Sequence, residues 1–71
     1  MSLIKKIRIE KGISQENIAT ALGVSTATVS RWESGEFIPR AEKLVRLAEL
    51  LGVTTDDLLK NQLAFNAKQS D

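Results

Sequence analysis

The chain has 71 residues, a formal net charge of +1 at pH 7, and neither cysteine nor histidine. A chain of this length forms one small domain, and it lacks the side chains for disulfides, thiolate zinc sites and histidine-activated nucleophiles, so we expect no metal, no cofactor and no enzymatic activity. No apolar run approaches the ~20 residues of a membrane-spanning helix and no signal-peptide pattern opens the sequence, which predicts a cytoplasmic protein without membrane contact.

The first expected helix covers residues 2–11. Leu3, Ile4 and Ile7 recur at helical spacing and stop before Gly12, which can take the left-handed conformation that ends many helices. The chain therefore opens on a short amphipathic helix.

A second helix is expected over residues 15–22, with Ser14 as its N-cap, because a serine oxygen can accept a hydrogen bond from a free amide of the first turn. Its apolar face is formed by Ile18, Ala19 and Leu22. Gly23 ends this helix, so the helix is short.

A third helix follows almost directly, with Ser25 as its N-cap and Gly35 at its end. Val29 and Trp32 form its inward stripe. Trp32 is a candidate for stacking on a base, but it lies on the same side of the helix as Val29, which predicts a core position instead.

The opposite face of this third helix carries small and hydroxyl side chains in place of the usual glutamates and lysines. At about 100° per residue, this face consists of Ala27, Ser30 and Arg31, with Thr26 and Thr28 on its flanks. Short side chains permit close approach to a large rigid surface, and a DNA major groove admits a helix. Arg31 is the sharpest candidate for reading a base, because arginine can pair with guanine in bidentate fashion. The alternative is an ordinary solvated face, with Arg31 near Glu36 or a phosphate.

A fourth helix is expected after Pro39 and before Gly52. Its apolar positions follow the i, i+3, i+4, i+7 pattern and are Leu44, Leu47, Ala48 and Leu51. Thr54 with Asp57 resembles a capping box that opens a fifth helix. The sequence thus predicts an all-α fold, a compact five-helix domain over residues 1–60.

The tail, residues 61–71, has no clear cap or period, and we expect it to be disordered or to help form a dimer. Candidate dimer contacts are Leu58, Leu59, Leu63 and Phe65. For the two leucines of the fifth helix, the alternative is that they complete the core.

The second and third helices are joined by a tight turn at Gly23, with the small Ala19 where they cross, which is a helix-turn-helix arrangement. The segment SQENIATALGVSTATVSRWESG resembles the helix-turn-helix of the lambda-repressor and Cro family, also called XRE-like regulators. Positions that keep the family spacing are Gln15, Ala19, Gly23, Val24, Ser25, Val29, Trp32, Glu33 and Gly35. The resemblance extends through Pro39 and LAELLGVTTDDLL, and so covers residues 3 to about 60.

The resemblance implies that residues 25–33 form a recognition helix in the major groove of double-stranded DNA. The candidate DNA-binding residues are Gln15, Ser25, Thr26, Ala27, Thr28, Ser30, Arg31 and Arg40. Gln15 matches a glutamine that holds a phosphate and braces the recognition helix, and its alternative is an ordinary surface residue. Arg40 matches a loop position that faces the DNA backbone or minor groove, and its alternative is a solvated residue. Glu36 departs from the pattern, because an acidic side chain there repels phosphate.

Arg8 and Glu33 each fall among apolar positions, Arg8 beside Ile4 and Glu33 beside Val29. We predict that the two charges meet in a buried ion pair, since a buried charge without a partner is strongly destabilising. The family resemblance also supports this pairing. Its role is to orient the recognition helix, not to read bases.

A single domain with three or four cationic phosphate contacts binds DNA weakly, because each contributes only about 0.9 to the salt slope. We therefore predict a homodimer on a pseudo-palindromic operator, with recognition helices about 34–36 Å apart. The predicted function is transcriptional regulation without catalysis, as a small stand-alone repressor of the Cro type.

Two alternatives keep the same fold. One is an antitoxin that binds an operator and a toxin, although the sequence marks no surface for a protein partner. The other is a protein-interaction module without DNA binding, which near-neutral charge and Glu36 favour and which Gln15 and Arg31 oppose. A third alternative, an enzyme that uses serine, lysine and aspartate, lacks any signal of a deep site.

Overall fold

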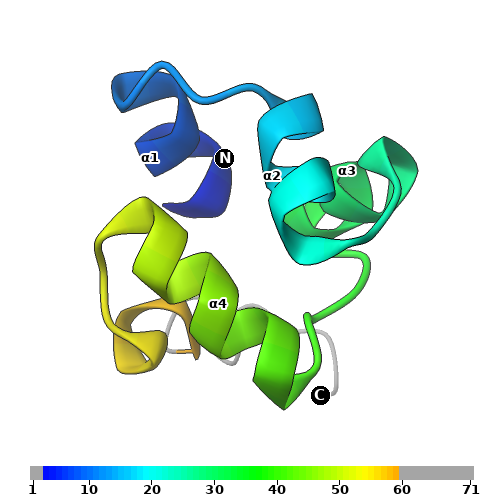
Figure 1. Cartoon of the computed structure of the whole chain (residues 1–71). Helices are drawn as coiled ribbons and strands as arrows, with labels where there is room; N and C mark the ends of the chain where they lie inside the picture. The colour runs from blue at the N-terminus through cyan, green and yellow to red at the C-terminus, as the bar shows by residue number, and fades with distance from the viewer. Residues whose placement is uncertain (1–2, 60–71) are drawn as a thin grey trace.

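The computed structural model describes residues 3–59, and every regular element within them is helical, which confirms the predicted all-α fold (Figure 1). The labelled helices are α1 (Leu3–Glu10), α2 (Gln15–Leu22), α3 (Thr26–Ser34) and α4 (Ala41–Leu51). Residues 55–59 are also helical and contain the start predicted after Thr54. None of the helices in this part of the chain is long and apolar enough to cross a membrane.

Helices α2 and α3 begin where side-chain caps satisfy free amides of their first turns. Ser14 Oγ accepts from the amide of Asn17 at 3.0 Å, and Asn17 Oδ1 accepts from the amide of Ser14 at 3.2 Å, which completes a capping box. Ser25 Oγ accepts from the amide of Thr28 at 3.1 Å. The predicted caps at Ser14 and Ser25 are therefore confirmed.

The turn between α2 and α3 depends on a glycine. Gly23 has φ 71°, a left-handed conformation that glycine adopts without steric penalty. The amide of Val24 then donates to the carbonyl of Ala19 at 2.9 Å, which ends α2 and lets the chain turn toward α3. As a result, α3 starts immediately beside the C-terminal end of α2.

One core joins all the helices. Its buried apolar residues are Ile4, Ile7, Ile18, Ala19, Leu22, Val29, Trp32, Leu44, Leu47, Ala48, Leu51 and Leu58. Helix α2 packs on α3 and α4, and α1 packs on the same two helices (Figure 1). The core thus fixes α3 from behind and leaves its opposite face outside. The predicted core position of Trp32 is confirmed.

The structure corrects one candidate for dimer contact. Leu58 is only 1% exposed and belongs to the core, so its side chain is closed to a second chain. Leu59 is half-buried against the same core. Leu58 therefore serves the alternative role, completion of the core, while a dimer contact of Leu59 stays a prediction. The tail at 61–71, with Leu63 and Phe65, lies outside the described residues.

Candidate nucleic-acid interface

Helix α3 presents two opposite faces. On the inner face, Val29 is fully buried and Trp32 is 4% exposed. The outward positions that the structure leaves exposed are Ser25, Thr26, Ala27, Ser30 and Arg31. Thr28, on the flank, is half-buried. We call these residues together the outer face of α3: Ser25, Thr26, Ala27, Thr28, Ser30 and Arg31.

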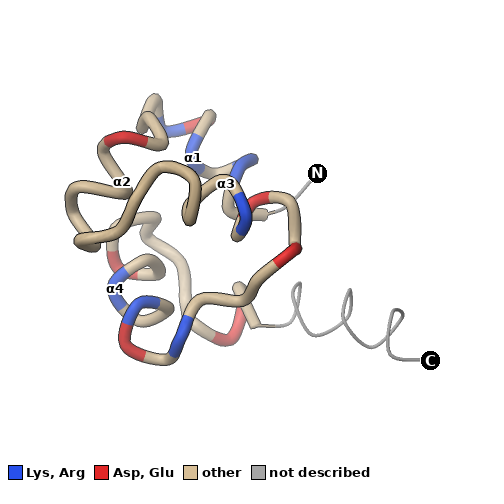
Figure 2. Tube along the Cα trace, turned by 90° about the vertical axis from the view of Figure 1, so that its right-hand side faces the viewer, with Lys and Arg blue, Asp and Glu red and all other residues tan. Residues whose placement is uncertain are grey.

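The surface around this face is uncharged at its centre. Residues 17–30 contain no charged side chain, so the tube over most of α2 and the turn into α3 is tan in Figure 2. Lysine and arginine positions lie beyond it, near the end of α3 and along α4 (Figure 2). Acidic positions lie among these cations, including Glu36 and Glu42, so the neutral centre has margins of mixed charge.

A polar cluster holds α3 from the inner side. Glu33 accepts hydrogen bonds from Arg8 Nε at 2.6 Å, from Arg8 Nη2 at 3.3 Å and from Gln15 Nε2 at 2.9 Å. Arg8 Nη1 donates to the carbonyl of Ile13 at 3.1 Å. The side chains of Arg8 and Glu33 are 13% and 5% exposed. The structure therefore brings the predicted ion pair together, and it ties α1 and the start of α2 to the recognition helix candidate.

The family resemblance implies two roles for Gln15, a phosphate contact and the bracing of the recognition helix. The hydrogen bond to Glu33 Oε1 places its amide in the bracing position, and its side chain is half-buried. The sequence gives no signal for this bond, because Gln15 and Glu33 are 18 positions apart. The second role, toward a phosphate, stays a prediction.

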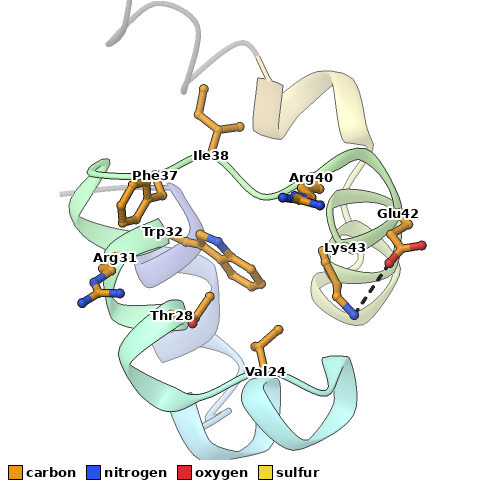
Figure 3. A pocket seen from close by; sticks show the side chains of 9 residues that line it. All are labelled: Val24, Thr28, Arg31, Trp32, Phe37, Ile38, Arg40, Glu42 and Lys43. Atoms are coloured by element: carbon orange, nitrogen blue, oxygen red, sulfur yellow. Dashed lines mark ion pairs between the residues drawn. The ribbon is translucent and has the colours of Figure 1, made fainter.

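A groove of about 450 Å³ runs between α3 and the start of α4 (Figure 3). It is lined by Val24, Thr28, Arg31, Trp32, Phe37, Ile38, Arg40, Glu42 and Lys43. Thr28 and Arg31 lie along one wall, and Arg40 and Lys43 lie on the opposite wall (Figure 3). Arg40 is exposed and stands at the N-cap position of α4. Within residues 3–59, no group of three acidic, histidine or cysteine side chains is placed to hold a metal ion.

Arg31 has two neighbours in the loop after α3. Its Nε lies 3.9 Å from Glu36 Oε2, and its guanidinium carbon lies 5.7 Å from the centre of the Phe37 ring. The side chains of Arg31 and Glu36 are both more than half exposed, and such pairs contribute little in water. The sequence predicts Glu36 as a neighbour of Arg31, but it does not predict the contact with Phe37. The contacts leave Arg31 accessible.

The comparison with known proteins matches a family model described as Helix-turn-helix over residues 4–58. The chain is 40% identical over 57 residues, 80% of its length, to the SPbeta prophage-derived HTH-type transcriptional regulator YonR of Bacillus subtilis. It is 36% identical over 59 residues (83%) to the HTH-type transcriptional activator BcrR of Enterococcus faecalis. It is 32% identical over 60 residues (84%) to the cryptic phage CTXphi transcriptional repressor RstR of Vibrio cholerae.

These relatives are longer than the matched region. The aligned segments cover 53% of YonR, 29% of BcrR and 54% of RstR, so the chain spans about half or less of each. The names of all three are those of transcriptional regulators, not of enzymes. No solved structure matches the chain significantly.

Proposed function

The chain belongs to the helix-turn-helix family of the lambda-repressor and XRE type, and on that premise we propose that it is a transcriptional regulator that binds double-stranded DNA. The observation that carries the proposal is the outer face of α3. Five of its six residues are exposed, its side chains are small and uncharged up to Arg31, and Val29 and Trp32 anchor the helix from behind. A helix of that shape fits the major groove.

Each part of the outer face has a separate role in this proposal. Thr26, Ala27, Thr28 and Ser30 contact base edges and thymine methyl groups, and Arg31 pairs with a guanine. Ser25, Gln15 and Arg40 contact the backbone, which positions α3 without reading sequence. Arg8 and Glu33 take no part in contact, because their charges are satisfied inside the domain.

We further propose a homodimer on a pseudo-palindromic operator. The interface offers few cations, and two copies double the number of phosphate contacts that release counterions. The spacing of the two recognition helices is then one helical turn of DNA, about 34–36 Å. Repression of the Cro type follows from occupying the operator and excluding RNA polymerase, which requires no surface beyond the interface itself.

The decisive experiment is a titration of the protein against random duplexes and duplexes selected from a random pool, at two salt concentrations. A DNA-binding regulator binds both with strong salt dependence and prefers the selected sequences. A protein-interaction module that has lost DNA binding binds neither duplex at either salt concentration. The second result contradicts the proposal.

Arg31→Ala is expected to relax the preference at one base position by roughly 1–3 kcal/mol, because the bidentate contact with guanine is lost. Binding-site selection with the variant measures this loss position by position. Arg31→Lys is the matched control, since it keeps the charge and loses the planar fork. Equal weakening on all sequences, with a salt slope smaller by about 0.9, would instead identify Arg31 as a phosphate ligand.

Glu36→Gln is expected to raise affinity for all duplexes by roughly two- to fivefold. The carboxylate lies 3.9 Å from Arg31 Nε, so its removal frees Arg31 and takes a negative charge away from the phosphates. The gain is modest because exposed pairs are worth about 0–1 kcal/mol. Titration of a labelled duplex measures it, and Glu49→Gln on exposed α4 surface is the control. Equal gains for both variants would contradict a local role of Glu36.

A further inference from the structure

The C-terminal end of α2 receives hydrogen bonds from two different parts of the molecule. A helix leaves its last four carbonyls without intrahelical partners. The amides of the turn satisfy the first two of them, since Gly23 donates to the carbonyls of Ala19 and Thr20 and Val24 donates to that of Ala19. The carbonyls of Ala21 and Leu22 remain.

Both remaining carbonyls are satisfied by cations from α4. Lys43 Nζ donates to the carbonyl of Leu22 at 2.8 Å, and Arg46 Nη2 donates to that of Ala21 at 3.2 Å. Positive charge at this end also complements the negative pole of the α2 dipole. Lys43 is the stronger of the two, because its side chain is only 28% exposed and therefore less screened by solvent. Its nearest carboxylate, Glu42 Oε1, is 3.9 Å away.

The carbonyls that α4 holds lie directly before the turn that aims α3. The turn from Gly23 to Ser25 follows the carbonyl of Leu22, and Ser25 caps α3. At its far end, α3 is held through Glu33 by Arg8 and Gln15. The recognition helix candidate is thus held at its far end by α1 and the start of α2, and at its near end it follows a turn whose preceding carbonyls, on α2, are held by α4.

From this geometry we infer that Lys43, assisted by Arg46, is a positioning residue for the recognition helix and not a phosphate ligand. The inference rests on the proposed DNA-binding function. Lys43 also lines the groove beside α3, where a lysine would ordinarily be counted among the phosphate contacts (Figure 3). The hydrogen bond to Leu22 instead directs its ammonium group to the α2 terminus.

The salt dependence of binding separates the two roles. A phosphate ligand contributes about 0.9 to the slope of log affinity against log salt, and it weakens binding to every sequence alike when removed. A positioning residue releases no counterion. Its removal misaligns α3, so the preference for the selected duplex over random DNA falls while the slope stays the same.

The experiment compares Lys43→Met and Arg46→Met with the unmodified chain, on selected and random duplexes at several salt concentrations, together with thermal melting. For Lys43→Met, the ratio of selected to random affinity is expected to fall roughly 3- to 10-fold, as one charge-assisted hydrogen bond at a helix end is lost, with an unchanged salt slope. Lys43→Arg is expected to restore the ratio. Lys6→Met, which removes the same charge from an exposed site on α1, is the control.

Three results overturn the inference. A salt slope reduced by about 0.9 with an unchanged ratio makes Lys43 a phosphate ligand. A lower melting temperature with an unchanged ratio makes its role merely structural. If the unmodified chain shows no salt-sensitive binding to DNA, the proposed function is wrong, and so is the inference that rests on it. If Lys43→Met does not fold, Lys43→Gln, which keeps a donor without the charge, and Arg46→Met carry the same comparison.

Discussion

Glu33→Ala is expected to lower the free energy of unfolding by about 3–5 kcal/mol, the range for removing one partner of a buried ion pair. The substitution takes away every hydrogen bond that Glu33 accepts from Arg8 and Gln15. Arg8 then keeps its charge in a site where its side chain is 13% exposed, with one remaining bond, to the carbonyl of Ile13. The uncompensated charge, and not the lost packing, dominates the effect.

The loss is large relative to the stability of so small a domain. At roughly 4–8 °C per kcal/mol for a chain of this size, the melting temperature falls by at least about 12 °C. Unfolding can be followed by the fluorescence of Trp32, the only tryptophan of the chain. The control is Glu49→Ala, which removes an exposed carboxylate from α4.

A double substitution isolates the cause. Arg8→Met together with Glu33→Met replaces the ion pair by apolar side chains, and such replacements of buried pairs are often neutral or stabilising. The double variant is therefore expected to be more stable than Glu33→Ala. If Glu33→Ala melts at the same temperature as the unmodified chain, the pair does not hold α1 to α3.

Ala27→Glu is expected to weaken DNA binding by on the order of 3 kcal/mol, roughly a hundredfold, while the domain stays folded. Ala27 lies in the first turn of α3, in the centre of the outer face, and is exposed. A carboxylate there enters a groove lined by phosphates, where like charges repel. Within the domain it is tolerated, since an acidic residue near a helix N-terminus is stabilising by about 0.3–1 kcal/mol.

The opposite effects on folding and on binding make this substitution diagnostic. Thermal melting reports the first, and fluorescence anisotropy of a labelled duplex reports the second. Ala27→Gln adds a side chain of similar size without charge, so the difference between the two variants measures the electrostatic part. Undiminished binding by Ala27→Glu would mean that α3 does not enter the groove, whatever else the protein binds.

Local signals in the sequence were sufficient to predict the helices. The bounds expected for the second helix, 15–22, agree with α2, because Ser14 and Gly23 act on amides and carbonyls only a few residues away. The inward stripe of α3 was also predictable, since the period of a helix decides which residues share a side. The same rule does not decide whether Leu58 and Leu59 belong to the core or to a dimer contact, because it does not say what covers an apolar side.

The sequence also predicted part of the polar cluster at Glu33. A charge within an apolar stripe requires a partner, and Arg8 was the other charge so placed, so the sequence pointed to the pair. It gave no sign that Gln15 would also donate to Glu33, or that Arg31 would lie over Phe37. Long polar side chains have many rotamers, and neighbouring helices select among them.

The sequence by itself determined where the second and third helices begin and end, which face of each is apolar, and that the face with Ala27 and Arg31 has no part in the core. Only the tertiary structure decided which cations form hydrogen bonds within the domain. Lys43 and Arg46 lie on α4, yet their donors reach the last carbonyls of α2, more than 20 residues earlier in the chain. That contact depends on the angle at which α4 packs against α2, and the packing of a whole core sets such an angle.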